Sequence, residues 1–133
     1  MKLNLKLNTT RAITAVSAGA TAALLAGAGL AQASSAVGNI GWMSANRTGV
    51  MCVQIDLAEN GYYSGRVDGA YGSGTEAGVK ALQHSLGLSR DGIVGKDTGS
   101  AVLNDLKGLL GSYTVTLPDG SRADCWKYVP SHS

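Results

Sequence analysis

The chain has 133 residues, a length that suits one domain. Its 11 Lys and Arg residues against 9 Asp and Glu give a formal net charge of +2, but three of the basic residues lie in the first eleven positions. From residue 36 onward, 8 basic residues face 9 acidic ones, which is a net charge of −1. A body so near neutrality lacks the positive field that nucleic-acid binding requires, so we expect no nucleic-acid partner. With two Cys and two His in the chain, we also expect no metal site and no cofactor.

Residues 1–33 have the pattern of a secretory signal peptide. Three basic residues precede an uncharged run over 12–30, and the small-residue motif A-Q-A at 31–33 is typical of a cleavage site. A cut after Ala33 leaves 100 residues, and a cut after Ala36 is the alternative. An uncleaved membrane anchor is the other interpretation, although a run rich in Ala and Gly inserts poorly. We expect a soluble exported protein that has no membrane contact after cleavage.

Export changes the interpretation of Cys52 and Cys125, the only cysteines in the chain. Outside the cell an isolated pair usually forms a disulfide. We therefore predict a bond between them, across a separation of 73 residues. A catalytic thiol is the alternative, but it would need a basic partner such as His84 or His132, and no local motif supports one.

The middle of the chain contains an internal repeat. Residues 68–79 and 91–102 both follow D-G-x-x-G-x-x-T-x-x-x-V, at an offset of 23. A helical segment with a Val/Leu-Gln pair precedes each copy and supplies Gln54 and Gln83. The span from Gln to Asp is 14 residues in the first copy and 8 in the second, and the surplus lies in the link 59–67. Neither half can bury its apolar stripe alone, so we expect the two halves to pack together.

Three stretches have apolar residues at i, i+3 and i+7. They predict amphipathic helices over 49–59, 74–86 and 98–110. Ser73, with Glu76 three residues later, fits a capping box that opens the second helix. A glycine follows each helix where a left-handed helix end is expected, at Gly61, Gly87 and Gly111. In the D-G-x-x-G turns, Asp should accept hydrogen bonds from nearby backbone N–H groups and Gly should supply a positive φ.

The first helix is apolar on more than one face, since only Gln54 and Asp56 are polar between residues 50 and 58. A helix that is apolar nearly all round is covered on two sides. The segment around Cys125 predicts the second cover, a β-hairpin with strands over 113–117 and 122–129 joined by a P-D-G turn. We expect this hairpin to pack on the outer face of the first helix.

Residues 50–106 resemble a known family. V-x-x-V-Q over 50–54, G-Y-Y-x-G over 61–65 and the two D-G-x-x-G-x-x-T units occur in order. Together they are similar to the small three-helix peptidoglycan-binding domain of bacteria, with Val53 in place of the usual Leu and Leu82 in place of a frequent aromatic residue. The resemblance implies an all-α, three-helix fold built from a duplicated helix-turn unit, here with a small C-terminal β-hairpin. In the family the module is usually non-catalytic and joined to a cell-wall hydrolase.

The predicted organisation is a signal peptide over 1–33, an N-terminal flank over 34–48, the peptidoglycan-binding-like domain over 49–110, and a hairpin extension over 111–133 tied to the domain by the disulfide. Trp42 and Trp126 lie in the two flanks, where we expect them to dock the termini rather than to stack on sugars. We expect His84 to be exposed and His132, near the chain end, to be mobile.

The duplication distinguishes residues that the fold requires from residues that are candidates for a binding site. Positions shared by both copies are explained by the fold, whereas features that one copy gained are candidates for function. Aromatic faces stack on sugar C–H surfaces, and Arg and hydroxyl groups bind amides and carboxylates. In the resembling modules the first turn carries the binding surface, which adds its Asp and Thr as rim candidates. The predicted ligand-binding residues are Tyr62, Tyr63, Arg66, Asp68, Tyr71 and Thr75. The alternative for the link is that one tyrosine caps the core and the other shields a loop.

We therefore expect a secreted, cell-wall-associated monomer that stands alone and binds peptidoglycan or its muropeptides without catalytic activity. One alternative is an exported protein-interaction module, an adaptor or inhibitor whose partner is a cell-wall enzyme. A small cell-wall hydrolase is a further alternative, although no G-x-S-x-G, H-E-x-x-H or Cys–His motif supports it.

Overall fold

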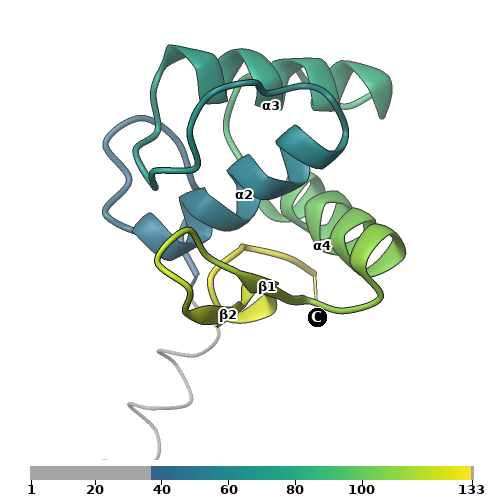
Figure 1. The fold of residues 1–133 in the computed structure, drawn as a ribbon. Helices are drawn as coiled ribbons and strands as arrows, with labels where there is room; N and C mark the ends of the chain where they lie inside the picture. The colour runs from purple at the N-terminus through teal and green to yellow at the C-terminus, as the bar shows by residue number, and fades with distance from the viewer. Residues whose placement is uncertain (1–36, 133) are drawn as a thin grey trace, which may run out of the picture. The chain divides into compact units, whose positions relative to one another are not determined.

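The computed structural model describes residues 37–132, so the predicted signal peptide lies outside the described residues. The described part folds as three α-helices followed by a small antiparallel hairpin and a short 3₁₀-helix (Figure 1). The elements are α2 (Arg47–Glu59), α3 (Ser73–Ser85), α4 (Lys96–Leu110), β1 (Thr114–Thr116), β2 (Arg122–Asp124) and η1 (Cys125–Lys127). The predicted all-α fold with an added hairpin is confirmed. Between residues 37 and 132, no helix has the length and apolar character needed to cross a bilayer.

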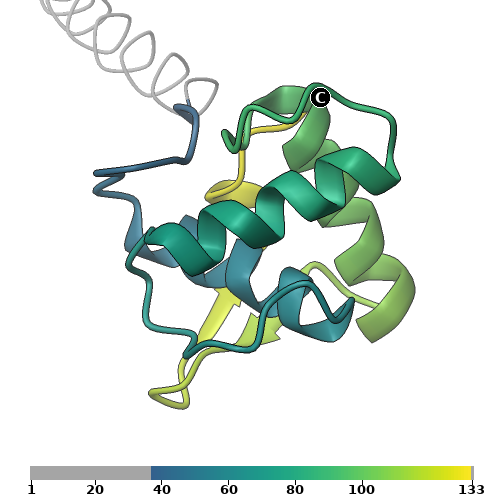
Figure 2. The same ribbon diagram turned by 90° about the horizontal axis from the view of Figure 1, so that it is seen from above.

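Helix α2 is the central element of this unit. It contacts α3, α4 and η1, and two views of the ribbon show it between α3 and the hairpin (Figures 1 and 2). The predicted disulfide is present: Cys52 of α2 is bonded to Cys125 at the start of η1, and their Cα atoms are 5.8 Å apart. Both cysteines are fully buried. The C-terminal extension therefore covers the outer face of α2, as its two-sided apolar pattern predicts.

The core is formed by the apolar stripes of the three helices, with contributions from both flanks. Its fully buried members include Val50, Val53, Leu57, Val79, Val102 and Leu106. Ile40 of the N-terminal flank is also fully buried, and its backbone pairs with that of Val94 in both directions, at 3.0 and 2.8 Å. The flank ahead of the repeat is thus part of the fold.

The predicted helix ends are confirmed, and the predicted capping box is wrong. Gly61, Gly87 and Gly111 follow the helices with φ of 77°, 68° and 70°. However, α3 begins with Gly72 as its N-cap, and no side chain caps it. Ser73 is already helical, so its hydroxyl is not in the capping position. The Glu76 carboxylate instead pairs with Lys80 and accepts a hydrogen bond from the Trp42 indole.

The hairpin is shorter than predicted. Its two strands pair in the register Thr114 with Asp124, Val115 with Ala123 and Thr116 with Arg122. The expected second strand over 122–129 stops at Asp124, because the chain turns into η1 and the N–H groups of Tyr128 and Val129 both bond to the Cys125 carbonyl. The disulfide holds the chain at this bend.

The end of the chain packs against the starts of two helices. Asn46 caps α2 by accepting a hydrogen bond from Gly49 N–H at 2.9 Å, and its amide also donates to the Tyr128 carbonyl at 2.6 Å. Along α4, a Cβ added to Gly99 would lie 1.7 Å from the Pro130 carbonyl oxygen. Glycine is therefore needed at this contact, where the C-terminal backbone crosses the helix.

Candidate functional site

Each copy of the repeat is organised around one buried glutamine. In the first copy, Gln54 lies on α2, and its amide NH₂ donates to the Asp68 carboxylate and the Thr75 hydroxyl at 3.1 and 3.0 Å. It also donates to the Ala70 carbonyl at 3.1 Å, while its oxygen accepts from the N–H groups of Asp68 and Gly69. The glutamine thus holds the D-G-x-x-G turn against the two helices.

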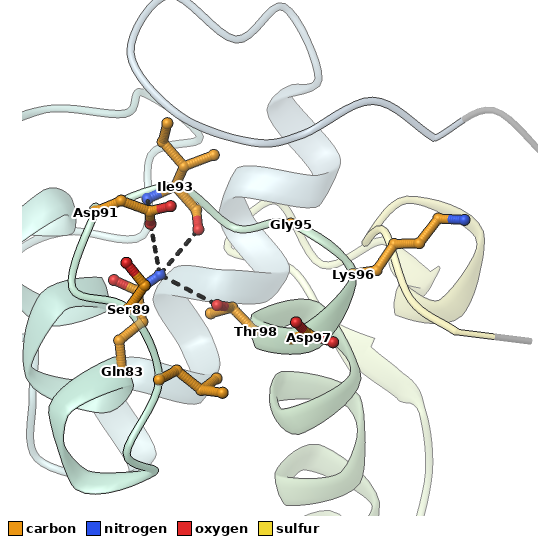
Figure 3. Close-up of a pocket in the computed structure, with 9 residues that line it drawn as sticks. Gln83, Ser89, Asp91, Ile93, Gly95, Lys96, Asp97 and Thr98 are labelled. Atoms are coloured by element: carbon orange, nitrogen blue, oxygen red, sulfur yellow. Dashed lines mark hydrogen bonds between the residues drawn. The ribbon is translucent and has the colours of Figure 1, made fainter.

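The second copy repeats this arrangement. The Gln83 amide donates to the Asp91 carboxylate, the Ile93 carbonyl and the Thr98 hydroxyl at 2.9, 2.9 and 3.1 Å (Figure 3). In both turns the predicted Asx geometry is confirmed: Asp68 accepts from Ala70 N–H and Asp91 from Ile93 N–H, each at 2.9 Å. These backbone bonds, followed by those from the glutamines, lower the pKa of both carboxyls. The shared positions therefore serve the fold.

The six predicted ligand-binding residues divide into two groups. Tyr62, Tyr63, Arg66 and Asp68 are exposed or half-buried along the link and the first turn. By contrast, Tyr71 is only 7% exposed, and its hydroxyl donates to the Gly92 carbonyl of the second copy. Thr75 is 1% exposed and is bonded to Gln54. The structure therefore leaves four candidates at least partly exposed and places the other two inside the domain. Of these two, Tyr71 bonds to the second copy, and Thr75 bonds to Gln54 of its own copy.

Within the link, Tyr63 folds back toward the repeat. Its hydroxyl donates to the Arg66 carbonyl at 2.7 Å and lies 3.5 Å from the Gln54 amide nitrogen. Its ring passes close to two glycines, since a Cβ added at Gly65 or Gly74 would lie 2.5 or 3.4 Å from ring or hydroxyl atoms. Tyr63 thus covers the side of the first turn next to Gln54.

The second copy has an open pocket at the equivalent place. This pocket, called here the repeat pocket, has a volume of about 140 Å³ (Figure 3). It is lined by Gln83, Leu88, Ser89, Asp91, Ile93, Gly95 and the first residues of α4, Lys96, Asp97 and Thr98. Gly74, which the Tyr63 ring approaches, corresponds to Asp97 at the repeat offset of 23. At the same offset Tyr63 corresponds to Leu86, which is 44% exposed and is not among the residues that line the pocket. The second copy thus has no tyrosine over its turn, and the pocket stays open.

The repeat pocket combines hydrogen-bond acceptors with an apolar wall. Asp91 and Asp97 are exposed carboxylates, and Ile93 is 43% exposed although it is a large apolar residue. The Lys96 side chain points away from the other labelled residues (Figure 3), so the acidic groups dominate the lining. Such a surface suits a ligand that donates hydrogen bonds from amide or ammonium groups. No cluster of three His, Cys, Asp or Glu side chains that could hold a metal ion occurs within the described residues.

A known protein family matches the part of the chain that contains both copies of the repeat. The family described as "Putative peptidoglycan binding domain" matches residues 46–102, which include both glutamine-centred turns and every residue that lines the repeat pocket. Residues 46–102 belong to the peptidoglycan-binding domain family. The match begins four residues before the region of resemblance identified from the sequence and ends four residues before its end.

Two relatives from Bacillus species are similar to less than half of this chain. The spore cortex-lytic enzyme of Bacillus subtilis (strain 168) is 42% identical over 55 residues, 41% of this chain and 18% of the enzyme. The Bacillus cereus enzyme of the same name is 36% identical over 58 residues, 44% of this chain and 22% of the enzyme. The chain thus spans about a fifth of these relatives. A crystal structure of the SleB N-terminal domain has 31% sequence identity and a TM-score of 0.46, covering 52% of this chain and 93% of that one.

Sequence reasoning missed the repeat pocket and its connection to the chain end. His132, expected to be mobile, donates its backbone N–H to the Ser100 hydroxyl at 3.0 Å, and its ring lies 2.7 Å from the Asp97 carboxylate. The one feature of the sequence that indicates the repeat pocket is the difference in length between the two links. The longer link of the first copy contains Tyr63, which covers the first turn, and the shorter link of the second copy has no such tyrosine. Trp42 docks through its bond to Glu76 but stays 59% exposed, and Trp126 is 55% exposed.

Proposed function

We propose that this chain is an exported, stand-alone module that binds peptidoglycan without catalysing its cleavage, and that the repeat pocket receives the stem peptide. The observation that supports the proposal is the open pocket beside Gln83, whose first-copy counterpart is covered by Tyr63. Its exposed carboxylates, Asp91 and Asp97, would accept hydrogen bonds from the amide or amino groups of a peptide.

Two serines provide a matched test of this site. Ser89 lines the repeat pocket, and Ser64 is exposed in the first-copy link, the surface favoured by the sequence. Ser89→Trp fills the pocket, and Ser64→Trp adds the same bulk to the link. In a pull-down with insoluble peptidoglycan, we expect Ser89→Trp to weaken retention at least tenfold and Ser64→Trp to leave it within twofold of the unchanged protein.

The same assay distinguishes the function from the location of the site. Recovery of the unchanged protein entirely in the supernatant, at low salt and neutral pH, would refute peptidoglycan binding. The opposite pattern, with Ser64→Trp alone impaired, would move the site to Tyr62, Tyr63, Arg66 and Asp68. Binding by small modules with shallow sites is typically weak, and many copies of the ligand along one polymer compensate for this.

The absence of catalysis is part of the proposal and has its own test. We expect suspended cell walls incubated with the pure protein to keep their turbidity, whereas clearing would make the protein a hydrolase.

The protein-interaction alternative predicts that a cell-wall enzyme stays cross-linked to the chain after the polymer has been digested. Localisation outside the cell is tested by the N-terminal residue of the mature protein, expected to be Ser34 or Val37 after cleavage.

A further inference from the structure

A second pocket lies where the C-terminal extension meets α4. It has a volume of about 480 Å³, within the range of small-molecule sites. We call it the aromatic pocket, because Tyr113 and Trp126 line it together with Ser100, Asn104 and His132. Both aromatic residues and the histidine lie beyond the residues that match the peptidoglycan-binding family. The residues beyond the family match therefore supply the aromatic side chains of this pocket.

The lining has the chemistry of a saccharide site. Trp126 is 55% exposed and Tyr113 is half-buried, so large aromatic surfaces are available to the C–H faces of a pyranose ring. Asn104 is exposed and makes no side-chain hydrogen bond within residues 37–132. Its amide can donate and accept at once, which matches the N–H and C=O of an acetamido group. Stacking and amide recognition together point to an N-acetylated amino sugar.

A lysine ammonium also lies over each of the two rings. The Lys107 ammonium lies 5.2 Å from the centre of the Tyr113 ring, and that of Lys127 lies 5.3 Å from the centre of the Trp126 ring. Lys127 is in turn paired with Asp124 at 2.9 Å. Rings with restricted orientations lose less conformational entropy when a ligand binds.

The aromatic pocket and the repeat pocket meet at one contact. Asp97 lines the repeat pocket, His132 lines the aromatic pocket, and the His132 ring nitrogen lies 2.7 Å from the Asp97 carboxylate. The two sites thus adjoin along the first half of α4. Peptidoglycan has the same arrangement, since its stem peptides branch directly from the glycan strand.

We propose that the aromatic pocket binds an N-acetylated amino sugar of the glycan strand while the repeat pocket holds the attached stem peptide. This inference rests on the proposed function and adds a glycan subsite to it. Trp126 and Tyr113 stack on the sugar, and Asn104 bonds to its acetamido group.

The test uses the full chain with its disulfide formed and three soluble probes: glycan strands freed of their peptides, chito-oligosaccharides, and free stem peptide. Trp126→Ala removes the exposed ring, and Trp42→Ala is the matched control, because Trp42 is equally exposed but bonded to Glu76 away from the pocket lining. By calorimetric titration we expect Trp126→Ala to weaken glycan binding at least tenfold and Trp42→Ala to leave glycan binding within twofold of the unchanged protein.

Both variants should bind stem peptide as the unchanged protein does. Asn104→Ala, a change at an exposed position, should weaken glycan binding at least threefold if Trp126→Ala does not fold.

Each other outcome has a definite meaning. If the unchanged protein binds stem peptide but no glycan, or if neither Trp126→Ala nor Asn104→Ala alters glycan binding, the glycan subsite is wrong and the proposed function stands. If it binds intact peptidoglycan and none of the variants differ, the subsite is again wrong. Failure to bind any probe or intact peptidoglycan overturns both proposals. Equal affinity for chito-oligosaccharides supports recognition of the acetamido sugar itself, and a preference for peptidoglycan strands supports the pocket with an added contribution from muramic acid.

Discussion

At the scale of single residues, Gln54 and Gln83 explain why the two halves of the domain share their sequence. Each is buried, and each ties an Asx turn and a threonine hydroxyl to a helix. This role could be inferred from the sequence, because both copies contain the same residues at the same offset. The burial of Tyr71 could not, since its hydroxyl bonds to the other copy and a pattern within one copy contains no information about contacts between copies.

Asp56 is the residue whose protonation should govern the pH dependence of stability. It is fully buried on α2, one of its carboxyl oxygens has no hydrogen-bond partner in the described structure, and burial, followed by repulsion from Asp105, raises its pKa to about 8. Between about pH 4 and pH 8 the folded state therefore retains a proton that the unfolded chain has released. The free energy of unfolding should fall as the pH rises through this window.

The variant Asp56→Asn keeps the shape of the side chain and the bond to Asn60 while removing the charge. We expect urea unfolding to show that it is more stable than the unchanged protein by about 2 kcal/mol or more at pH 8.5, since each unit of pKa shift corresponds to about 1.4 kcal/mol. At pH 4 the difference should be small. A stability difference that does not change with pH would contradict this account of Asp56.

At the scale of elements, local patterns predicted the three helices, but details set by distant contacts were missed. Apolar periodicity and terminal glycines located each helix within two residues of its observed ends. Ser73 and Glu76 have the right spacing for a capping box, yet the Glu76 carboxylate accepts a hydrogen bond from the Trp42 indole instead. Trp42 belongs to the N-terminal flank, and no local sequence pattern indicates where that flank lies. The repeat pocket was missed for a related reason: it exists because the second link lacks a residue like Tyr63.

Helix α4 offers two glycines in contrasting surroundings. A Cβ at Gly99 would collide with the backbone of Pro130, whereas nothing lies within 4 Å of a Cβ at Gly108. We expect Gly99→Ala to lower the free energy of unfolding by about 1–3 kcal/mol, as overpacking does. Gly108→Ala should raise it by about 0.5–1 kcal/mol, because alanine is the better helix former.

Urea denaturation followed by circular dichroism compares these two variants directly. Equal stabilisation by both would mean that the chain end does not cross α4 at Gly99. The aromatic pocket would then lose one of its walls, because Ser131 and His132 follow Pro130 directly.

At the scale of the whole described unit, the C-terminal extension is the feature that distinguishes this chain from the family domain alone. It covers the outer face of α2, is bonded to it through Cys125, and completes the aromatic pocket. The disulfide could be predicted from the expectation of export and the presence of two cysteines, and the hairpin from its P-D-G turn. The pocket could not be predicted, since it requires the chain end, η1 and α4 to be placed in three dimensions.

The disulfide should supply a large share of the stability of this unit. It joins residues separated by 73 positions, for which the chain-entropy model gives about 4 kcal/mol. We expect the double variant Cys52→Ala/Cys125→Ala to lose about 3–4 kcal/mol in urea unfolding. A loss below about 1 kcal/mol would show that packing of the extension, rather than the cross-link, holds it on α2.

Amide chemical-shift mapping of the protein titrated with soluble muropeptides tests most directly whether the repeat pocket binds peptidoglycan. We expect shifts centred on residues 88–98, with a second group at 104, 113 and 126 when the muropeptide retains its sugars. Shifts confined to residues 62–68, or no shifts at saturating muropeptide, would contradict this expectation.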